Sequence, residues 1–140
     1  MISFKFRKER LESGHLVKRP IILVELNNNG TKFESEALLD SGSDMTTLSL
    51  EIAKGLGLKI SEEKEELVGF KETTMVHTSR CEISVGRGYL KRKVSVPVLI
   101  VAEESINQED SIIIGVNGFF DAFDIRFRLN KERIELKPVN

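Results

Sequence analysis

Apolar and polar residues alternate along most of the chain, a period typical of β-strands that bury one face. The alternation is clear in Cys81–Val85, in Val94–Val101 and in Phe123–Leu129. Helical spacing of apolar residues is confined to two short stretches. We therefore predict a mainly β fold, in which short strands close on themselves as a small barrel-like domain with two short helices.

Two hairpins follow from the turn residues. Pro20–Leu26 and Thr31–Leu39 flank Asn27–Gly30, a strong hairpin signal because Asn and Gly tolerate positive φ. Leu67–Phe70 and Thr74–His77 flank a short polar stretch and predict a second hairpin with a Gly-containing tip.

The two helices are predicted from capping residues and spacing. Ser49 can cap a helix that Gly57 ends. The second helix is expected over Asn117–Phe123, with Phe119 and Phe123 on one face.

Three further features concern organisation. Pro97 places its strand at an edge or a bulge, because proline cannot donate to a β-ladder. The charge run Ser61–Glu66 is typical of a solvated loop or strand edge. At the start, Ile2, Phe4 and Phe6 alternate as in a short strand, and we divide the chain into an N-terminal extension (1–18) and one domain (19–140).

Composition narrows the class of protein. The chain has 140 residues, of which 40% are hydrophobic and 31% charged, as in a globular domain with a real core. The chain has 21 basic and 22 acidic residues, and its net charge is −1. It therefore has no net positive charge that would attract nucleic acid or an anionic membrane. No apolar run approaches the length of a membrane-spanning helix. We expect neither a nucleic-acid nor a membrane partner.

The single cysteine and the N-terminal residues bear on location. Cys81 cannot form an internal disulfide, which suits a reducing compartment, and residues 1–8 lack a signal-peptide hydrophobic region. We expect a cytoplasmic protein. Cys81 lies on an apolar strand face, so we interpret it as core filler and not as a nucleophile. His15 and His77 have no ligand partners at metal spacing, and we expect no metal and no cofactor.

One stretch carries a chemical signal. The apolar residues Leu38 and Leu39 run directly into Asp40, although burying an ionised carboxylate is costly unless it is hydrogen-bonded. Ser41 and Gly42 follow and supply a hydroxyl and accessible backbone N–H groups. Taken alone, Asp-Ser-Gly is also an ordinary turn after a strand. A second apolar run, Ile112–Ile114, leads directly into Gly115, just as Leu38 and Leu39 lead directly into Asp40.

Together these pieces resemble a retropepsin-type aspartic protease lobe, the family of retroviral, retrotransposon and related cellular proteases. The resemblance rests on residues 19–24 before the first hairpin, on residues 37–46, on the hairpin around Gly69, and on residues 113–115 before the second helix. Their order and spacing agree with the family from about residue 19 to residue 136.

The resemblance implies an aspartic endopeptidase that hydrolyses peptide bonds in a peptide or protein substrate. Asp40 would be the catalytic carboxylate, with Ser41 stiffening the pair across a dimer and the Gly42 N–H supporting the carboxylate. Only one Asp-Ser/Thr-Gly triplet is present. The resemblance therefore implies a homodimer, in which one Asp40 per subunit activates a shared water.

The resemblance also implies substrate contacts. Asp44 would bind the substrate backbone, and Gly69 and Phe70 would lie in a flap that closes over an extended peptide. Val98 would contribute to an apolar pocket wall. Two alternatives stay open: Asp44 could cap the turn or form a structural ion pair, and the hairpin could be an inert surface feature. We interpret Thr46 as a structural hydroxyl.

Two departures from the family favour an alternative function. Position 116 is Val, where many relatives carry Arg. A full hairpin, Asp124–Leu136, also follows the second helix, whereas retroviral enzymes end in a short strand. The alternative is a catalytically weak or inactive retropepsin-fold module for peptide binding or dimerisation.

Overall fold

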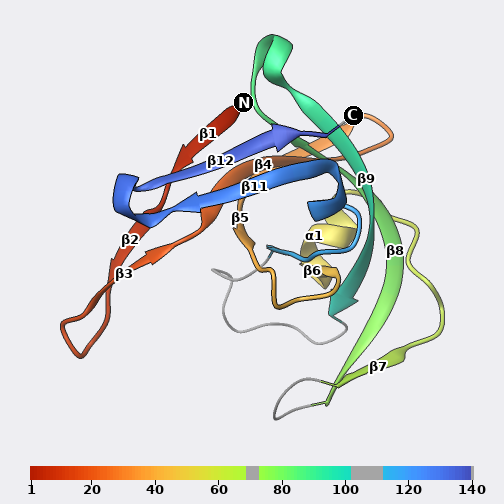
Figure 1. Ribbon diagram of the computed structural model, residues 1–140. Coiled ribbons are helices and arrows are strands. Elements are labelled where there is room, and N and C mark those ends of the chain that lie inside the picture. Colours follow the sequence, from red (N-terminus) through yellow and green to blue (C-terminus); the bar gives the residue numbers. More distant parts are fainter. Residues whose placement is uncertain (69–72, 102–111, 140) are drawn as a thin grey trace.

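The computed structural model describes residues 1–68, 73–101 and 112–139, and strands dominate it (Figure 1). The largest sheet has seven strands in the order β4-β5-β10-β6-β9-β8-β7. Their bounds are β4 (Ile21–Asn28), β5 (Thr31–Leu39), β6 (Thr46–Ser49), β7 (Glu65–Val68), β8 (Thr73–Val85), β9 (Arg92–Val101) and β10 (Ile112–Ile114). Strand β4 also pairs with β8, so six strands close into a barrel. The predicted mainly β, closed fold is confirmed.

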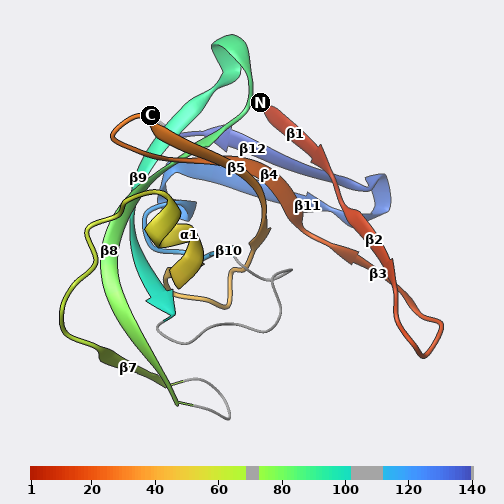
Figure 2. The ribbon, with the colours of Figure 1, turned by 180° about the vertical axis from the view of Figure 1, so that it is seen from behind.

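Two smaller sheets accompany the barrel (Figure 2). Strands β1 (Ile2–Lys5), β12 (Arg133–Pro138) and β11 (Phe123–Arg128) form one, with β12 in the middle. Strands β2 (Arg7–Arg10) and β3 (Leu16–Arg19) form a hairpin. The N-terminal residues belong to the core, since Ile2 and Phe6 are buried.

The first hairpin forms as predicted. Asn29 and Gly30 take φ values of 50° and 88°, the left-handed region that a tight two-residue turn needs. Ile22, Val24 and Leu26 alternate inward and are buried. The hairpin thus anchors β5 along its whole length up to Asp40.

The helices match the prediction in part. Helix α1 (Leu50–Gly55) begins after Ser49, whose hydroxyl accepts a hydrogen bond from the Ile52 N–H at 3.3 Å. The second predicted helix is wrong: only a 3-10 turn, η3 (Phe120–Ala122), forms there. Gly118 at φ 90° interrupts helical backbone.

Strand β9 corrects the interpretation of Pro97. The strand lies between β8 and β6, not at an edge of the sheet. Pairing with β6 begins only at Val98, so Pro97 faces no ladder on that side. Its missing N–H is therefore tolerated in a strand whose remainder is central.

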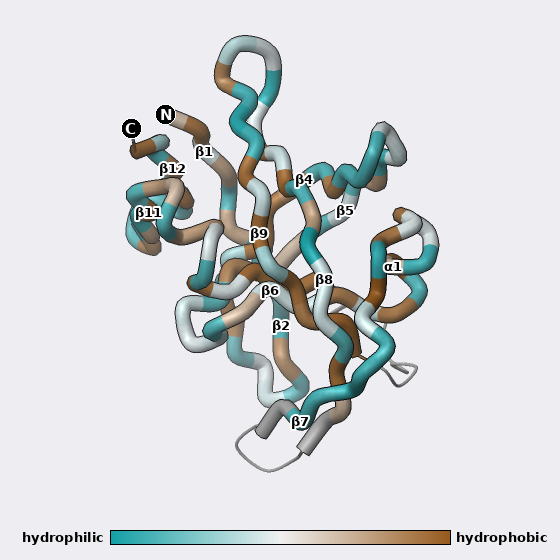
Figure 3. Tube along the Cα trace, turned by 90° about the vertical axis from the view of Figure 1, so that its right-hand side faces the viewer, coloured by the Kyte–Doolittle hydropathy of each residue, from teal (hydrophilic) through white to brown (hydrophobic). Residues whose placement is uncertain are grey.

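The polar segments lie outside the barrel. Glu62 to Glu66 are exposed, as predicted for the charge run, and the chain leading into β7 is hydrophilic in Figure 3. Two further 3-10 turns, η1 (Gly88–Leu90) and η4 (Leu129–Lys131), connect β8 to β9 and β11 to β12. No helix in the described part of the chain is long and apolar enough to cross a membrane.

Candidate active site

Two apolar strands end side by side at the site. Strand β10 runs parallel to β5, with Ile113 opposite Leu38 and Ile114 opposite Leu39. The Asp40 N–H donates to the Ile114 carbonyl at 3.0 Å and extends this pairing by one residue. Because both strands stop together, Asp40 and Gly115 leave the sheet at the same edge.

The turn after β5 holds the Asp40 carboxylate. The Gly42 N–H donates to Asp40 Oδ1 at 2.9 Å, and the Ser43 N–H donates to the Asp40 carbonyl at 3.1 Å. Leu39 is buried, whereas Asp40 is partly exposed. The acid therefore stands at the boundary between core and solvent, oriented by a backbone donor and open to a water or a second group.

The rest of the turn is fastened to the chain that follows β10. The Val116 N–H donates to the Ser43 carbonyl and the Asn117 N–H to the Asp44 carbonyl, each at 2.8 Å. The Ser43 hydroxyl donates to the Met45 carbonyl at 2.9 Å. These bonds make the turn rigid, which a site that positions a reactive carboxylate requires.

Thr46 and Gly115 bring the two segments into close contact. The Gly115 N–H donates to Thr46 Oγ1 at 3.2 Å, and Thr46 is fully buried. A Cβ on Gly115 would lie 2.4 Å from the backbone C and O atoms of Met45. Only glycine fits at this distance. The structural role predicted for the Thr46 hydroxyl is confirmed.

Other predicted site residues differ in placement. Ser41 and Asp44 are exposed beside Asp40. With the described residues, the Asp44 carboxylate forms no hydrogen bond or ion pair, so neither capping nor a structural ion pair explains it there. Gly69 and Phe70 lie outside the described residues. The arms of their hairpin are present, since β7 pairs with the start of β8.

Val98 lies in the core. Its side chain is 1% exposed and packs in the main hydrophobic cluster, so in this chain it offers almost no surface to a ligand. The pattern that suggested a pocket wall is the alternation of β9, and alternation indicates a buried face without saying what lies on that face.

Cys81 and His77 lie outside the Asp40 turn. Burial raises the pKa of the Cys81 thiol, which keeps it protonated at neutral pH and agrees with its interpretation as core filler. His77 Nδ1 lies 2.8 Å from the Ser61 carbonyl. Among the described residues, no group of three or more His, Cys, Asp or Glu could hold a metal ion.

Comparison with known proteins decides the family. A sequence profile described as aspartyl protease matches residues 24–117. The chain belongs to the aspartyl protease family. The match includes Asp40, the turn that holds it, and Gly115, and so covers both strand ends of the site. No curated protein matches the chain.

Solved structures show the same fold at low identity. One is a retropepsin-like aspartic protease from Rickettsia conorii, 17% identical, with a TM-score of 0.56 and 95% of each chain covered. Another is the retroviral protease-like domain of Ddi1 from Leishmania major, 14% identical, with a TM-score of 0.51, covering 86% of this chain and 90% of that one. The fold of this aspartyl protease family member is retropepsin-like, as the sequence resemblance predicted.

Proposed function

We propose that this protein is an aspartic endopeptidase that acts as a homodimer. The observation that carries the proposal is the Asp40 carboxylate, which stands at the end of a buried strand, is oriented by the Gly42 N–H at 2.9 Å and stays partly exposed. The Gly42 contact alone is that of an ordinary Asx turn. Four backbone bonds in addition fix the segment around this turn.

The chemistry needs a second carboxylate, and the chain has one Asp-Ser-Gly triplet. A two-fold axis near Asp40 would bring the same residue of a second copy into place. Two ionised carboxylates a few ångströms apart would repel each other strongly. They therefore share one proton, as in aspartic proteases generally.

The two copies of Asp40 have different roles, because only one of them carries the shared proton. The ionised Asp40 acts as general base and takes a proton from a water held between the two carboxyl groups. The protonated Asp40 donates a hydrogen bond to the scissile carbonyl. The water oxygen bonds to the carbonyl carbon, and the proton then passes to the leaving amine as the C–N bond breaks.

Substrate would lie as an extended strand across the site. The Asp44 carboxylate, exposed four residues after Asp40 and without a partner among the described residues, can accept hydrogen bonds from substrate backbone N–H groups. The β7–β8 hairpin would cover the opposite side of the peptide and exclude water from the reacting bond.

A second candidate function is peptide binding or dimerisation without cleavage. Val116 favours it, because this apolar residue is 36% exposed next to the site, where a charged brace would be expected from the family resemblance. An uncharged contact can form a dimer whose two carboxylates are held too loosely for catalysis.

Peptide cleavage separates the two candidates. Purified wild-type protein and Asp40→Asn are incubated with a diverse peptide mixture from acid to neutral pH, and new termini are read by mass spectrometry. Cuts made by the wild type and absent with Asp40→Asn support the endopeptidase. If neither protein cuts at any pH while both are folded and dimeric, the binding module replaces it.

A further inference from the structure

A cavity lies outside the candidate active site, and none of its lining residues belongs to the Asp40 turn. It has a volume of about 770 Å³ and is bordered by β1, β4 and the turn between β8 and β9. Strands β2 and β3 form a paired hairpin, and β1 and β4, which continue them, diverge in Figure 2. The turn between β8 and β9, at the top of the view in Figure 1, contributes Gly86, Arg87, Gly88 and Leu90 to the lining.

The cavity walls are apolar and held in place. Ile2, Phe4, Leu23 and Leu90 line it, and Leu23 is 40% exposed although it lies in a central part of the hairpin. The turn is packed tightly, because a Cβ on Gly86 would lie 2.9 Å from the Leu90 carbonyl oxygen and 3.1 Å from Ile2 Cδ1. The pocket is thus preformed, as ligand sites usually are.

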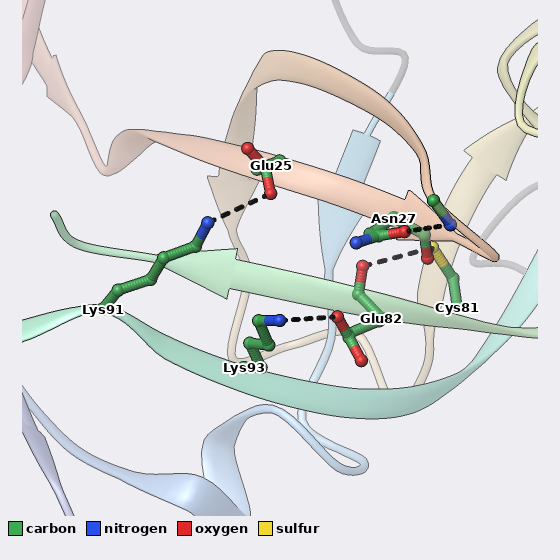
Figure 4. A network of polar contacts seen from close by, with 7 residues as sticks. Glu25, Asn27, Cys81, Glu82, Lys91 and Lys93 are labelled. Atoms are coloured by element: carbon green, nitrogen blue, oxygen red, sulfur yellow. Dashed lines mark hydrogen bonds and ion pairs between the residues drawn. The ribbon is translucent and has the colours of Figure 1, made fainter. Parts of the chain in front are cut away.

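Charged groups of both signs line the same cavity. Glu25 Oε1 and Lys91 Nζ form an ion pair at 3.3 Å that joins β4 to the residue preceding β9 (Figure 4). Glu34 and Arg87 also line the cavity, and both are exposed. The lining therefore offers one exposed carboxylate and two exposed cationic groups, the Arg87 guanidinium and the Met1 ammonium, besides the pair of Glu25 and Lys91.

A buried hydroxyl adds a specific polar feature. Ser84 lines the cavity, is 2% exposed, and its hydroxyl has no hydrogen-bond partner among the described residues. Its neighbours in β8, Ile83 and Val85, are buried in the core. Buried hydroxyls are normally paired, because an unpaired one costs about 1–3 kcal/mol. A ligand amide in the cavity would supply the missing partner.

We propose that this cavity binds a short peptide that carries apolar side chains and free termini. Its volume lies in the range of small-ligand sites, roughly 300–1,000 Å³. The side chains would pack against Leu23 and Leu90, the ammonium would face Glu34, and the carboxylate would face Arg87. An amide group would hydrogen-bond to Ser84.

The charges that are not paired within the lining are of both signs, Glu34 on one side and Arg87 with the Met1 ammonium on the other. A zwitterion with an apolar body satisfies both signs of charge, and its binding here does not depend on the proposed peptidase activity.

The test uses the uncleaving Asp40→Asn protein, labelled with ¹⁵N and titrated with trileucine. The proposal expects saturable amide shifts at Leu23, Ser84, Gly86 and Leu90. N-acetyl trileucine amide, which lacks both charges, should bind about tenfold more weakly. Shifts confined to residues 40–46, or no saturation in the millimolar range, would overturn the proposal.

Variants assign the binding to the cavity. Leu23→Ser and Ser84→Ala should each weaken trileucine binding by about fivefold, since each removes one contact. Tyr89→Ala is the matched control, because Tyr89 is 89% exposed on the same turn and does not line the cavity. The amide spectrum of each variant reports whether it is folded. Unchanged affinity in both cavity variants would contradict the assignment.

Discussion

Strands β5 and β10 end at the same edge of the barrel, and they end differently. Strand β5 is followed by Asp40, a partly exposed carboxylate, whereas β10 is followed by Gly115, a buried residue without a side chain. The Asp40 N–H still bonds to β10 beyond the last paired residue. The first strand supplies the proposed catalytic carboxylate, and the second supplies the space that allows the turn around Asp40 to pack closely.

This difference separates activity from stability. The Asp40 side chain receives one hydrogen bond from its own turn and takes little part in the core. Gly115 touches the Met45 backbone and donates to the buried Thr46 hydroxyl. Substitutions at the two strand ends should therefore have opposite consequences.

The largest expected effect is on activity at Asp40. Asp40→Asn should lower the rate of peptide cleavage by at least about 1,000-fold, because the amide can neither take nor give the catalytic proton. The free energy of unfolding, measured with urea, should change by less than about 0.5 kcal/mol. A large loss of stability would show that the carboxylate has a structural role, and would contradict the expected difference between Asp40 and Gly115.

The largest expected effect on stability is at Gly115. Gly115→Ala should lower the free energy of unfolding by about 3 kcal/mol, because its Cβ would overlap the Met45 backbone. Gly55→Ala is the matched control. No atom lies within 4 Å of the added Cβ at this helical position, so alanine should stabilise by about 0.5–1 kcal/mol. Equal effects of the two substitutions would contradict the close-contact explanation.

A smaller loss is expected at Thr46. Thr46→Val keeps the shape but leaves the Gly115 N–H without an acceptor, and should destabilise by about 2 kcal/mol. Thr46→Ser keeps the hydroxyl and should cost less. The urea midpoints of the two variants measure the difference, and a serine variant less stable than the valine variant would assign the role to packing instead.

The smallest expected effect lies far from both strand ends, in the turn between β11 and β12. A hydrogen bond from Lys8, at 2.8 Å, lowers the pKa of the Glu132 carboxyl below its ordinary value of 4.5, with a contribution from Lys18. The stabilisation is present above pH 4.5 and is lost as the pH falls through the lowered pKa.

Glu132→Gln should therefore be slightly less stable than wild type at pH 7, and the difference between the two urea midpoints should shrink as the pH falls below 4.5. Peptide cleavage at neutral pH should not change. A difference in stability that does not shrink in acid would show that the charge of the Glu132 carboxylate is not its cause.

The sequence alone predicted the parts of the site that depend on local pattern. Asn29 and Gly30 determine the first hairpin, and the apolar residues before Asp40 and Gly115 predict two buried strand ends. Ser49 predicts the start of α1. In each case the residues that carry the signal are neighbours in sequence.

The features that were not predicted depend on distant contacts. Thr46 and Gly115 are 69 positions apart, and no local pattern identifies their hydrogen bond. The expected helix over residues 117–123 does not form because Gly118 takes a positive φ where it packs against Val96 and Pro97. Val98 is a further example. The alternation in β9 predicts that Val98 is buried, but it does not say whether a buried residue reaches a ligand.

The most direct test of the shared-carboxylate mechanism mixes active and inactive subunits. Wild-type protein is refolded with an equal amount of Asp40→Asn protein, and the cleavage rate is compared with that of the same amount of wild type refolded alone. If subunits pair at random, about half of the wild-type chains join an Asn partner, so the rate should fall to about half and should fall further with excess variant. A rate that stays unchanged while the subunits are shown to mix would mean that a single Asp40 suffices, and would contradict the account.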